Sequence, residues 1–131
     1  MPITLADAKV LLQAGEAKAA DMRLVVSISV VDARGDVVAI HRMDGARYFT
    51  PEVARGKAMA AAVFGQPSAE LTERAKLPAL QSLNQMHQGR FVFGQGGLPI
   101  SRTAETEGAV GVSGGTAEQD EEIAKAAIAA L

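Results

Sequence analysis

The sequence predicts an α+β domain with an antiparallel sheet of about five strands flanked by helices. Amphipathic helical segments stand at both ends of the chain, two alternating segments joined by a short turn follow the first helix, and no regular strand-helix-strand alternation is present. A chain of 131 residues is expected to form one domain, residues 1–131, and to bury a core without disulfides or a structural metal.

The N-terminal half supplies a helix and a strand hairpin. Thr4 followed by Asp7 predicts a capped helix start, and apolar residues then recur at steps of three and four: Leu5, Ala8, Leu12, Gly15, Ala19 and Met22. Residues 24–31 alternate in character and predict a strand. Gly35 suits the turn that follows, and residues 36–43 predict a second strand.

The next segment, residues 51–64, predicts a helix with Pro51 in its first turn and Thr50 as N-cap. Alanine and glycine dominate this helix, so its backbone can lie close to a sheet. Lys57 shares the apolar face of the helix, which is unusual for a charged residue. Either its ammonium group reaches solvent at the edge of that face, or it binds a ligand.

The C-terminal half predicts several short elements and a last helix. Helical segments are expected at residues 69–75 and 77–87, after a break at Gly65 and Pro67, and strands at residues 90–93, 98–101 and 108–112. Thr116 and Gln119 form a capping-box pattern at the start of the final helix.

Composition argues against several classes of partner and chemistry. A net charge of −2 with scattered basic residues predicts no nucleic-acid surface, and no apolar run approaches the length of a membrane span. The absence of cysteine excludes disulfides and thiolate sites, and the first residues do not resemble a signal peptide, so a cytoplasmic protein is expected. Abundant alanine produces small-residue faces that suit self-association into a homo-oligomer.

Residues 111–115 match the letters G-x-S-x-G in a strand-turn-helix context, the pattern of a hydrolase nucleophile. A base histidine should follow the serine, yet His41 and His87 both precede Ser113, and the chain is too short for that fold. Ser113 is therefore interpreted as a turn or ligand-contact hydroxyl. The two histidines form no metal-binding pattern, so no metal site is predicted.

Two glycine clusters mark backbone that turns sharply or approaches another group closely: Gly94, Gly96 and Gly97, then Gly111, Gly114 and Gly115. The second cluster leads into a helix N-terminus, where free N–H groups can bind an anion. Acidic residues in the first turns of that helix favour simple capping instead. Both interpretations stay open.

A second constellation of polar residues comes from the end of the hairpin. His41 can exchange protons near neutral pH, Arg42 and Arg47 can bind a carboxylate, and Asp44 can orient either kind of group. The alternative is a solvated strand end with ordinary surface charges.

Five fragments together resemble the GlcG/HbpS haem-binding-protein-like family across nearly the whole chain: RMDGA at 42–46, KA at 57–58, FGQPS at 64–68, GGLPI at 96–100, and GVSGG at 111–115 with QD at 119–120. The resemblance implies an antiparallel sheet of about five strands, similar to profilin or PAS-like folds, and homo-oligomers. Family members are associated with haem or corrinoid biology and with glycolate or diol utilisation. Residues 101–108 depart from the family pattern, because they lack its Asp-Gly turn.

The first functional hypothesis is a homo-oligomeric domain that binds a small carboxylate or haem-like ligand between the loop 43–50, the helix of Lys57 and the glycine clusters. The expected ligand-binding residues are Arg42, Arg47, Lys57, Gly96, Gly97, Ser113, Gly114 and Gly115. For haem, the iron ligand would come from His41, His87, Met43, Met86 or Tyr48. The competing hypothesis is a cofactor-independent lyase or isomerase acting on a small oxo- or hydroxy-acid, with His41 and Asp44 as acid and base.

Overall fold

The computed structural model describes residues 2–131, which form four α-helices, two 3-10 helices and four strands. The helices are α1 (Leu5–Asp21), α2 (Thr50–Phe64), α3 (Pro78–Met86) and α4 (Ala117–Ala129), with the 3-10 helices η1 (Ser68–Leu71) and η2 (Arg74–Lys76). The strands are β1 (Ser27–Asp32), β2 (Val37–Arg42), β3 (Gly97–Ile100) and β4 (Gly108–Ser113). The α+β class is confirmed.

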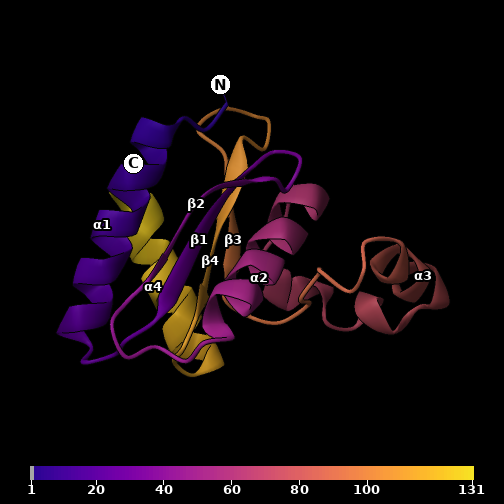
Figure 1. The fold of residues 1–131 in the computed structure, drawn as a ribbon. Helices are drawn as coiled ribbons and strands as arrows, with labels where there is room; N and C mark the ends of the chain where they lie inside the picture. Colours follow the sequence, from indigo (N-terminus) through magenta and orange to yellow (C-terminus); the bar gives the residue numbers. More distant parts are fainter. Residues whose placement is uncertain (1) are drawn as a thin grey trace.

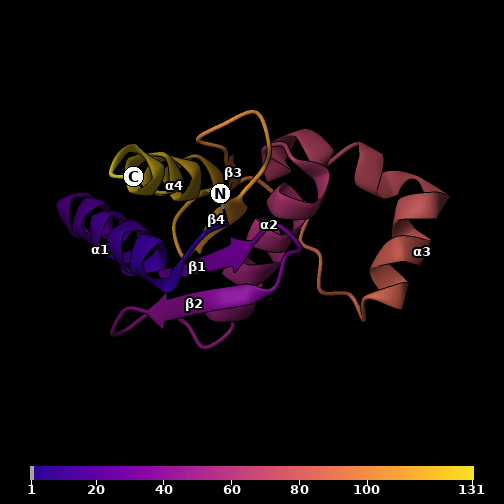
Figure 2. The same ribbon diagram turned by 90° about the horizontal axis from the view of Figure 1, so that it is seen from above.

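The strands form one sheet in the order β2-β1-β4-β3, and every neighbouring pair is antiparallel. Helices α1 and α4 cover one face of this sheet and α2 covers the other (Figures 1 and 2). Between the sheet and the α1–α4 layer lies a core of large aliphatic side chains, whose fully buried members include Leu11, Leu12, Ile28, Val110 and Ile123. The layer beneath α2 is made of small residues, namely Val31, Ala58, Ala61, Ala62 and Ala109.

Both predicted capping boxes are confirmed. The Asp7 N–H donates to the Thr4 hydroxyl, and the Thr4 N–H donates back to the Asp7 carboxylate, each over 3.0 Å. Thr116 and Gln119 form the same reciprocal pair at the start of α4, at 3.2 and 2.9 Å. These local bonds satisfy N–H groups that a helix leaves unpaired, so the sequence alone places both starts.

The prediction of Thr50 as the N-cap of α2 is wrong, because Phe49 occupies that position and Thr50 is already helical. The Thr50 hydroxyl instead donates to the Arg47 carbonyl oxygen over 2.7 Å and is hydrogen-bonded to the Ser27 hydroxyl at 2.8 Å. Thr50 therefore ties the start of α2 to β1 rather than capping its own helix.

The sheet has four strands rather than five, because residues 90–93 are extended but lie outside it. The Val92 N–H donates to the carbonyl oxygen of Gly56 in α2 over 3.2 Å, and the Val92 side chain occupies the space where a Cβ at Gly56 would lie. The predicted helix at 69–75 is also different, since η1 and η2 replace it. The helix predicted at 77–87 is present as α3.

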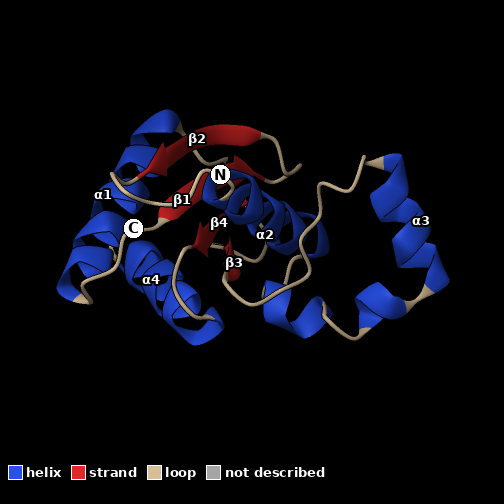
Figure 3. Ribbon diagram, turned by 60° about the horizontal axis from the view of Figure 1, so that its bottom comes forward, coloured by secondary structure: helices blue, strands red, loops and turns tan. Residues whose placement is uncertain are grey.

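Between α2 and β3 the chain leaves this three-layer body and forms an arm, defined here as residues 65–96, that carries η1, η2 and α3 (Figures 1 and 3). Where the arm joins the body, Phe91 and Phe93 stack at a centroid distance of 5.5 Å, and Phe64 meets both rings edge to face at 5.9 and 6.1 Å. Met59, Ala60, Leu71 and Leu83 complete this separate small core.

Candidate functional site

A hollow of about 330 Å³ lies between the loop that precedes α2 and the turn that follows β4. We call it the loop hollow. Its walls come from Val25, residues 45–47, Phe49 and Thr50 on one side and from residues 113–115 on the other. The loop and the second glycine cluster, which the sequence singled out separately, thus face each other across one depression.

The loop wall is held in shape by its own backbone. The Ala46 N–H donates to the Met43 carbonyl oxygen, and the Thr50 N–H to that of Arg47, over 3.1 and 3.0 Å. The Arg42 guanidinium donates to the carbonyl oxygen of Ala46 over 3.1 Å, so this predicted ligand-binding cation braces the loop from outside the hollow.

Ser113 provides a polar group within the opposite wall. The Ser113 residue is 6% exposed, and its hydroxyl forms no hydrogen bond with the described residues 2–131. At Gly114 the backbone φ is +140°, and a Cβ there would stand 2.8 Å from the Val25 carbonyl oxygen, so glycine is required for the turn to close against β1. Because Ser113 lines the hollow and its hydroxyl has no partner among the described residues, the hydroxyl is available to a ligand there.

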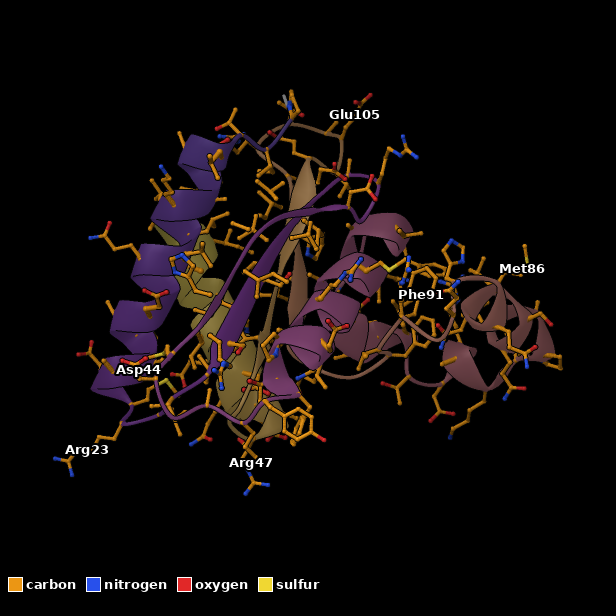
Figure 4. All side chains as sticks on the ribbon, viewed as in Figure 1. Arg23, Asp44, Arg47, Met86, Phe91 and Glu105 are labelled. Carbon is orange, nitrogen blue, oxygen red and sulfur yellow. The ribbon has the colours of Figure 1, made fainter. Side chains whose placement is uncertain are left out.

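The mouth of the loop hollow combines a cation with two aromatic rings. Arg47 is exposed, forms no ion pair with the described residues, and extends away from the body (Figure 4). Tyr48 is 86% and Phe49 43% exposed, and their rings meet edge to face at a centroid distance of 5.5 Å. Sequence reasoning missed Phe49 and Val25; two adjacent rings in a polar loop, in a chain with one Tyr and four Phe, were the available signal.

His41 and Asp44 line a different hollow, of about 550 Å³, beside the end of β2. The His41 Nδ1 atom lies 2.5 Å from the Glu16 carboxylate of α1. Sequence reasoning missed Glu16, although its place between Leu12 and Ala19 on the buried side of α1 was a signal. The structure separates His41 and Asp44 from Arg47 and residues 113–115, so the predicted residues fall into two groups.

Lys57 belongs to neither hollow. Its residue is 7% exposed, and its ammonium group donates to the Val112 carbonyl oxygen over 2.9 Å and to the Asp120 carboxylate over 3.0 Å. The prediction that the ammonium reaches solvent is wrong, because Asp120, itself 3% exposed, supplies a buried counter-charge. Gly96 and Gly97 pack directly against Lys57, which explains the first glycine cluster as a close backbone approach.

The second carboxylate oxygen of Asp120 accepts the Gly115 N–H over 2.8 Å. The N–H groups of Gly115 and Thr116 are thus already paired within the protein, Thr116 through its capping box. An anion in the loop hollow would depend on Arg47 and Ser113 rather than on the N-terminus of α4.

The residues considered as iron ligands are dispersed. His87 Nδ1 donates to the Leu83 carbonyl oxygen over 2.9 Å, since a carbonyl can only accept. The Met43 sulfur accepts the Val26 N–H at 3.5 Å. Met86 is 78% exposed on the arm, far from the loop hollow (Figure 4). Tyr48 stands between Arg47 and Phe49, which both line the loop hollow, and its ring contacts that of Phe49.

Within residues 2–131, no three His, Asp or Glu side chains gather in a way that could hold a metal ion. None of the helices in that range has the length and apolar character needed to span a bilayer.

The family model described as "Haem degrading protein HbpS-like" matches residues 3–129. The chain belongs to the HbpS-like family. This confirms the resemblance drawn from the five sequence fragments.

Two relatives of the chain are proteins of Citrobacter freundii. An uncharacterised 15.0 kDa protein from its dhaT-dhaS intergenic region is 41% identical over 127 residues, which cover 96% of this chain and 89% of that protein. The corrinoid adenosyltransferase PduO is 34% identical over 132 residues, covering all of this chain but only 39% of PduO. The likeness to PduO therefore concerns one part of that enzyme.

Among solved structures, a PduOC–haem complex superimposes with a TM-score of 0.88 and 32% identity, over 100% of this chain and 96% of that one. This HbpS-like fold has therefore been observed together with haem in a relative.

Proposed function

We propose that the protein binds a planar ligand with carboxylate groups, of the haem type, at the loop hollow, and that it assembles into a homo-oligomer. The observation that carries the proposal is the Ser113 hydroxyl, which has no partner among the described residues and lies in the same hollow as Arg47, whose guanidinium forms no ion pair with them. A guanidinium and a hydroxyl on the two facing walls suit a carboxylate, because charge-assisted hydrogen bonds are the stronger kind.

The residues at this hollow fit the parts of a haem. Arg47 and Ser113 would hold a propionate, while the exposed rings of Tyr48 and Phe49 would lie against the macrocycle. A volume of about 330 Å³ is near the lower end of the roughly 300–1,000 Å³ of ligand cavities, so the carboxylate edge would enter and the ring would stay outside. The Tyr48 phenol is a known type of haem-iron ligand. Bound haem would supply an iron centre for ligand or redox chemistry.

Kinship supports the choice of haem over other carboxylates. The family model is described by haem degradation, and a PduOC structure contains haem. Self-association is supported by the protruding arm, on which Leu77 is 52% and Met86 78% exposed.

Haem titration followed by the Soret band tests the proposal. Wild type is expected to give a saturable band, and Arg47→Ala and Ser113→Ala should each weaken binding by roughly tenfold, the loss of one charge-assisted contact. Arg34→Ala is the matched control, since Arg34 is an exposed arginine in the β1–β2 turn. A wild-type spectrum without saturation, or equal losses in all three variants, would refute haem binding at this hollow.

The proton-transfer alternative rests on one observation, the 2.5 Å contact between His41 and Glu16, because a carboxylate that orients an imidazole is a common general-base arrangement. Its test is exchange of the α-proton of small oxo- and hydroxy-acids in D₂O, followed by NMR. Exchange lost in both His41→Ala and Glu16→Gln would support an enzyme, and the absence of exchange with wild type would end this alternative.

A further inference from the structure

The wall of the loop hollow is connected to a charge pair buried beneath it. Lys57 donates to the carbonyl oxygen of Val112, the residue before Ser113, while Asp120 accepts the N–H of Gly115, the second residue after it. Lys57 and Asp120 are joined to each other at 3.0 Å. Ser113 is thus bracketed by two backbone groups that one ion pair holds.

The backbone of Gly96 packs closely against this ion pair. A Cβ on Gly96 would stand 2.9 Å from the Lys57 nitrogen and 2.9 Å from the Val112 oxygen, so the backbone of Gly96 packs directly against the pair. Gly96 also accepts the Val112 N–H over 3.0 Å. The pair is sealed inside the protein, between the sheet, α2 and α4.

The two buried charges also balance each other beneath the hollow. Asp120 alone would place an uncompensated negative charge beneath a site that receives a carboxylate, and Lys57 cancels it. Interactions between a buried charge and a nearby ligand are screened weakly, so removing one partner changes the potential at the site strongly.

We infer that the Lys57–Asp120 pair is a positioning element of the ligand site, which fixes the turn that presents Ser113 and keeps the floor of the site electrically neutral. This inference rests on the proposed function, because it concerns the same hollow. Neither residue touches the ligand. Both act through the backbone of residues 112–115 and through their charges.

Opposite changes of charge test it. Lys57→Met leaves Asp120 negative and should weaken haem binding by about tenfold. Asp120→Asn keeps an oxygen that can accept the Gly115 N–H and leaves Lys57 positive, so it should strengthen binding several-fold, as expected for a unit charge within ~10 Å at an effective dielectric of ~20. Both variants lose stability, so a merely structural role would weaken binding in both. Weaker binding in both variants would overturn the inference.

A second measurement covers the case in which a single variant does not fold. Lys57→Met/Asp120→Leu removes the pair together, a change that buried ion pairs often tolerate. Comparing haem with its dimethyl ester then reports on the carboxylate contact alone. The double variant should lose the preference for free haem as fully as Ser113→Ala does; a wild-type preference would overturn the positioning role. If wild type binds neither compound, the proposed function fails as well.

Discussion

Gly111 in β4 lies directly under the backbone of Ala54 in α2. A Cβ at position 111 would approach the Ala54 carbonyl oxygen more closely than any real contact permits and would stand 2.7 Å from the Ala58 nitrogen. Helix α2 therefore crosses the sheet where the strand has no side chain. The first glycine of the G-x-S-x-G letters is explained by helix packing, without any nucleophile.

Gly111→Ala should lower the free energy of unfolding by about 1–3 kcal/mol, since it overpacks a layer in which backbone meets backbone. Urea denaturation followed by circular dichroism measures this change. Gly94→Ala is the matched control, because nothing lies within 4 Å of a Cβ at Gly94. Equal midpoints for the two variants would contradict the close approach of α2.

Ser68→Ala should also destabilise the fold, because the Ser68 hydroxyl connects the arm to β3. It is fully buried, accepts the Gly97 N–H over 2.8 Å and donates to the Gly94 carbonyl oxygen over 2.5 Å. Losing it leaves buried backbone groups unpaired, at a cost of about 1–3 kcal/mol. Thr72→Ala, which removes an exposed hydroxyl of the same arm, should cost much less in the same urea experiment.

Acid should weaken the fold through Asp7, Glu107 and Arg102. The Thr4 backbone N–H and the Arg102 guanidinium lower the pKa of Asp7 from 3.8, and hydrogen bonds from the Arg102 side chain and backbone lower the pKa of Glu107 from 4.5. Because the unfolded chain then binds protons first, this stabilisation is complete above about pH 4.5 and is lost as the pH falls through the lower folded pKa values.

Unfolding free energies measured between pH 3 and pH 7 should therefore fall towards the acid end, and Arg102→Gln should flatten that dependence. Arg34→Gln is the control, since Arg34 and Asp36 form only an exposed contact at 3.9 Å. The same acid slope in Arg102→Gln as in wild type would show that this cluster does not govern the response.

The aromatic pair at the loop hollow predicts two different effects on haem. Tyr48→Phe keeps the ring and removes the phenol, so it should shift the Soret maximum while changing affinity by only a few-fold. Phe49→Ala removes ring contact and should weaken binding about tenfold. Met86→Ala, which changes an exposed apolar side chain on the arm, should alter neither the Soret maximum nor the affinity for haem. A Soret maximum that is identical in Tyr48→Phe would exclude the phenol as an iron ligand.

Features with a local cause could be predicted from the sequence. The helix starts at Thr4 and Thr116 depend on partners three residues away, and both hairpin strands follow from alternation. The turn of residues 113–115 and the loop before α2 were also identified, although only the fold shows that they face one hollow.

Features that depend on distant partners could not be predicted. Lys57 and Asp120 are 63 residues apart, and Glu16 and His41 are 25 residues apart, so neither pair could be predicted from a spacing in the sequence. Residues 90–93 have the composition of a strand, but the sheet consists of β1 to β4 only. These residues pack along α2 instead, where Gly56 leaves space for the Val92 side chain. Tertiary contacts decided these cases against local preference.

The unequal layers on the two faces of the sheet have a consequence for how such sequences diverge. Beneath α2, small residues and bare backbone leave no volume for a larger side chain, whereas the α1–α4 layer is built from aliphatic side chains that can exchange for one another at similar volume. The core residues of the α1–α4 layer should therefore vary among homologues, whereas those on the α2 side should remain almost unchanged. The alanines and glycines beneath α2 should then be the positions that best identify members of the family.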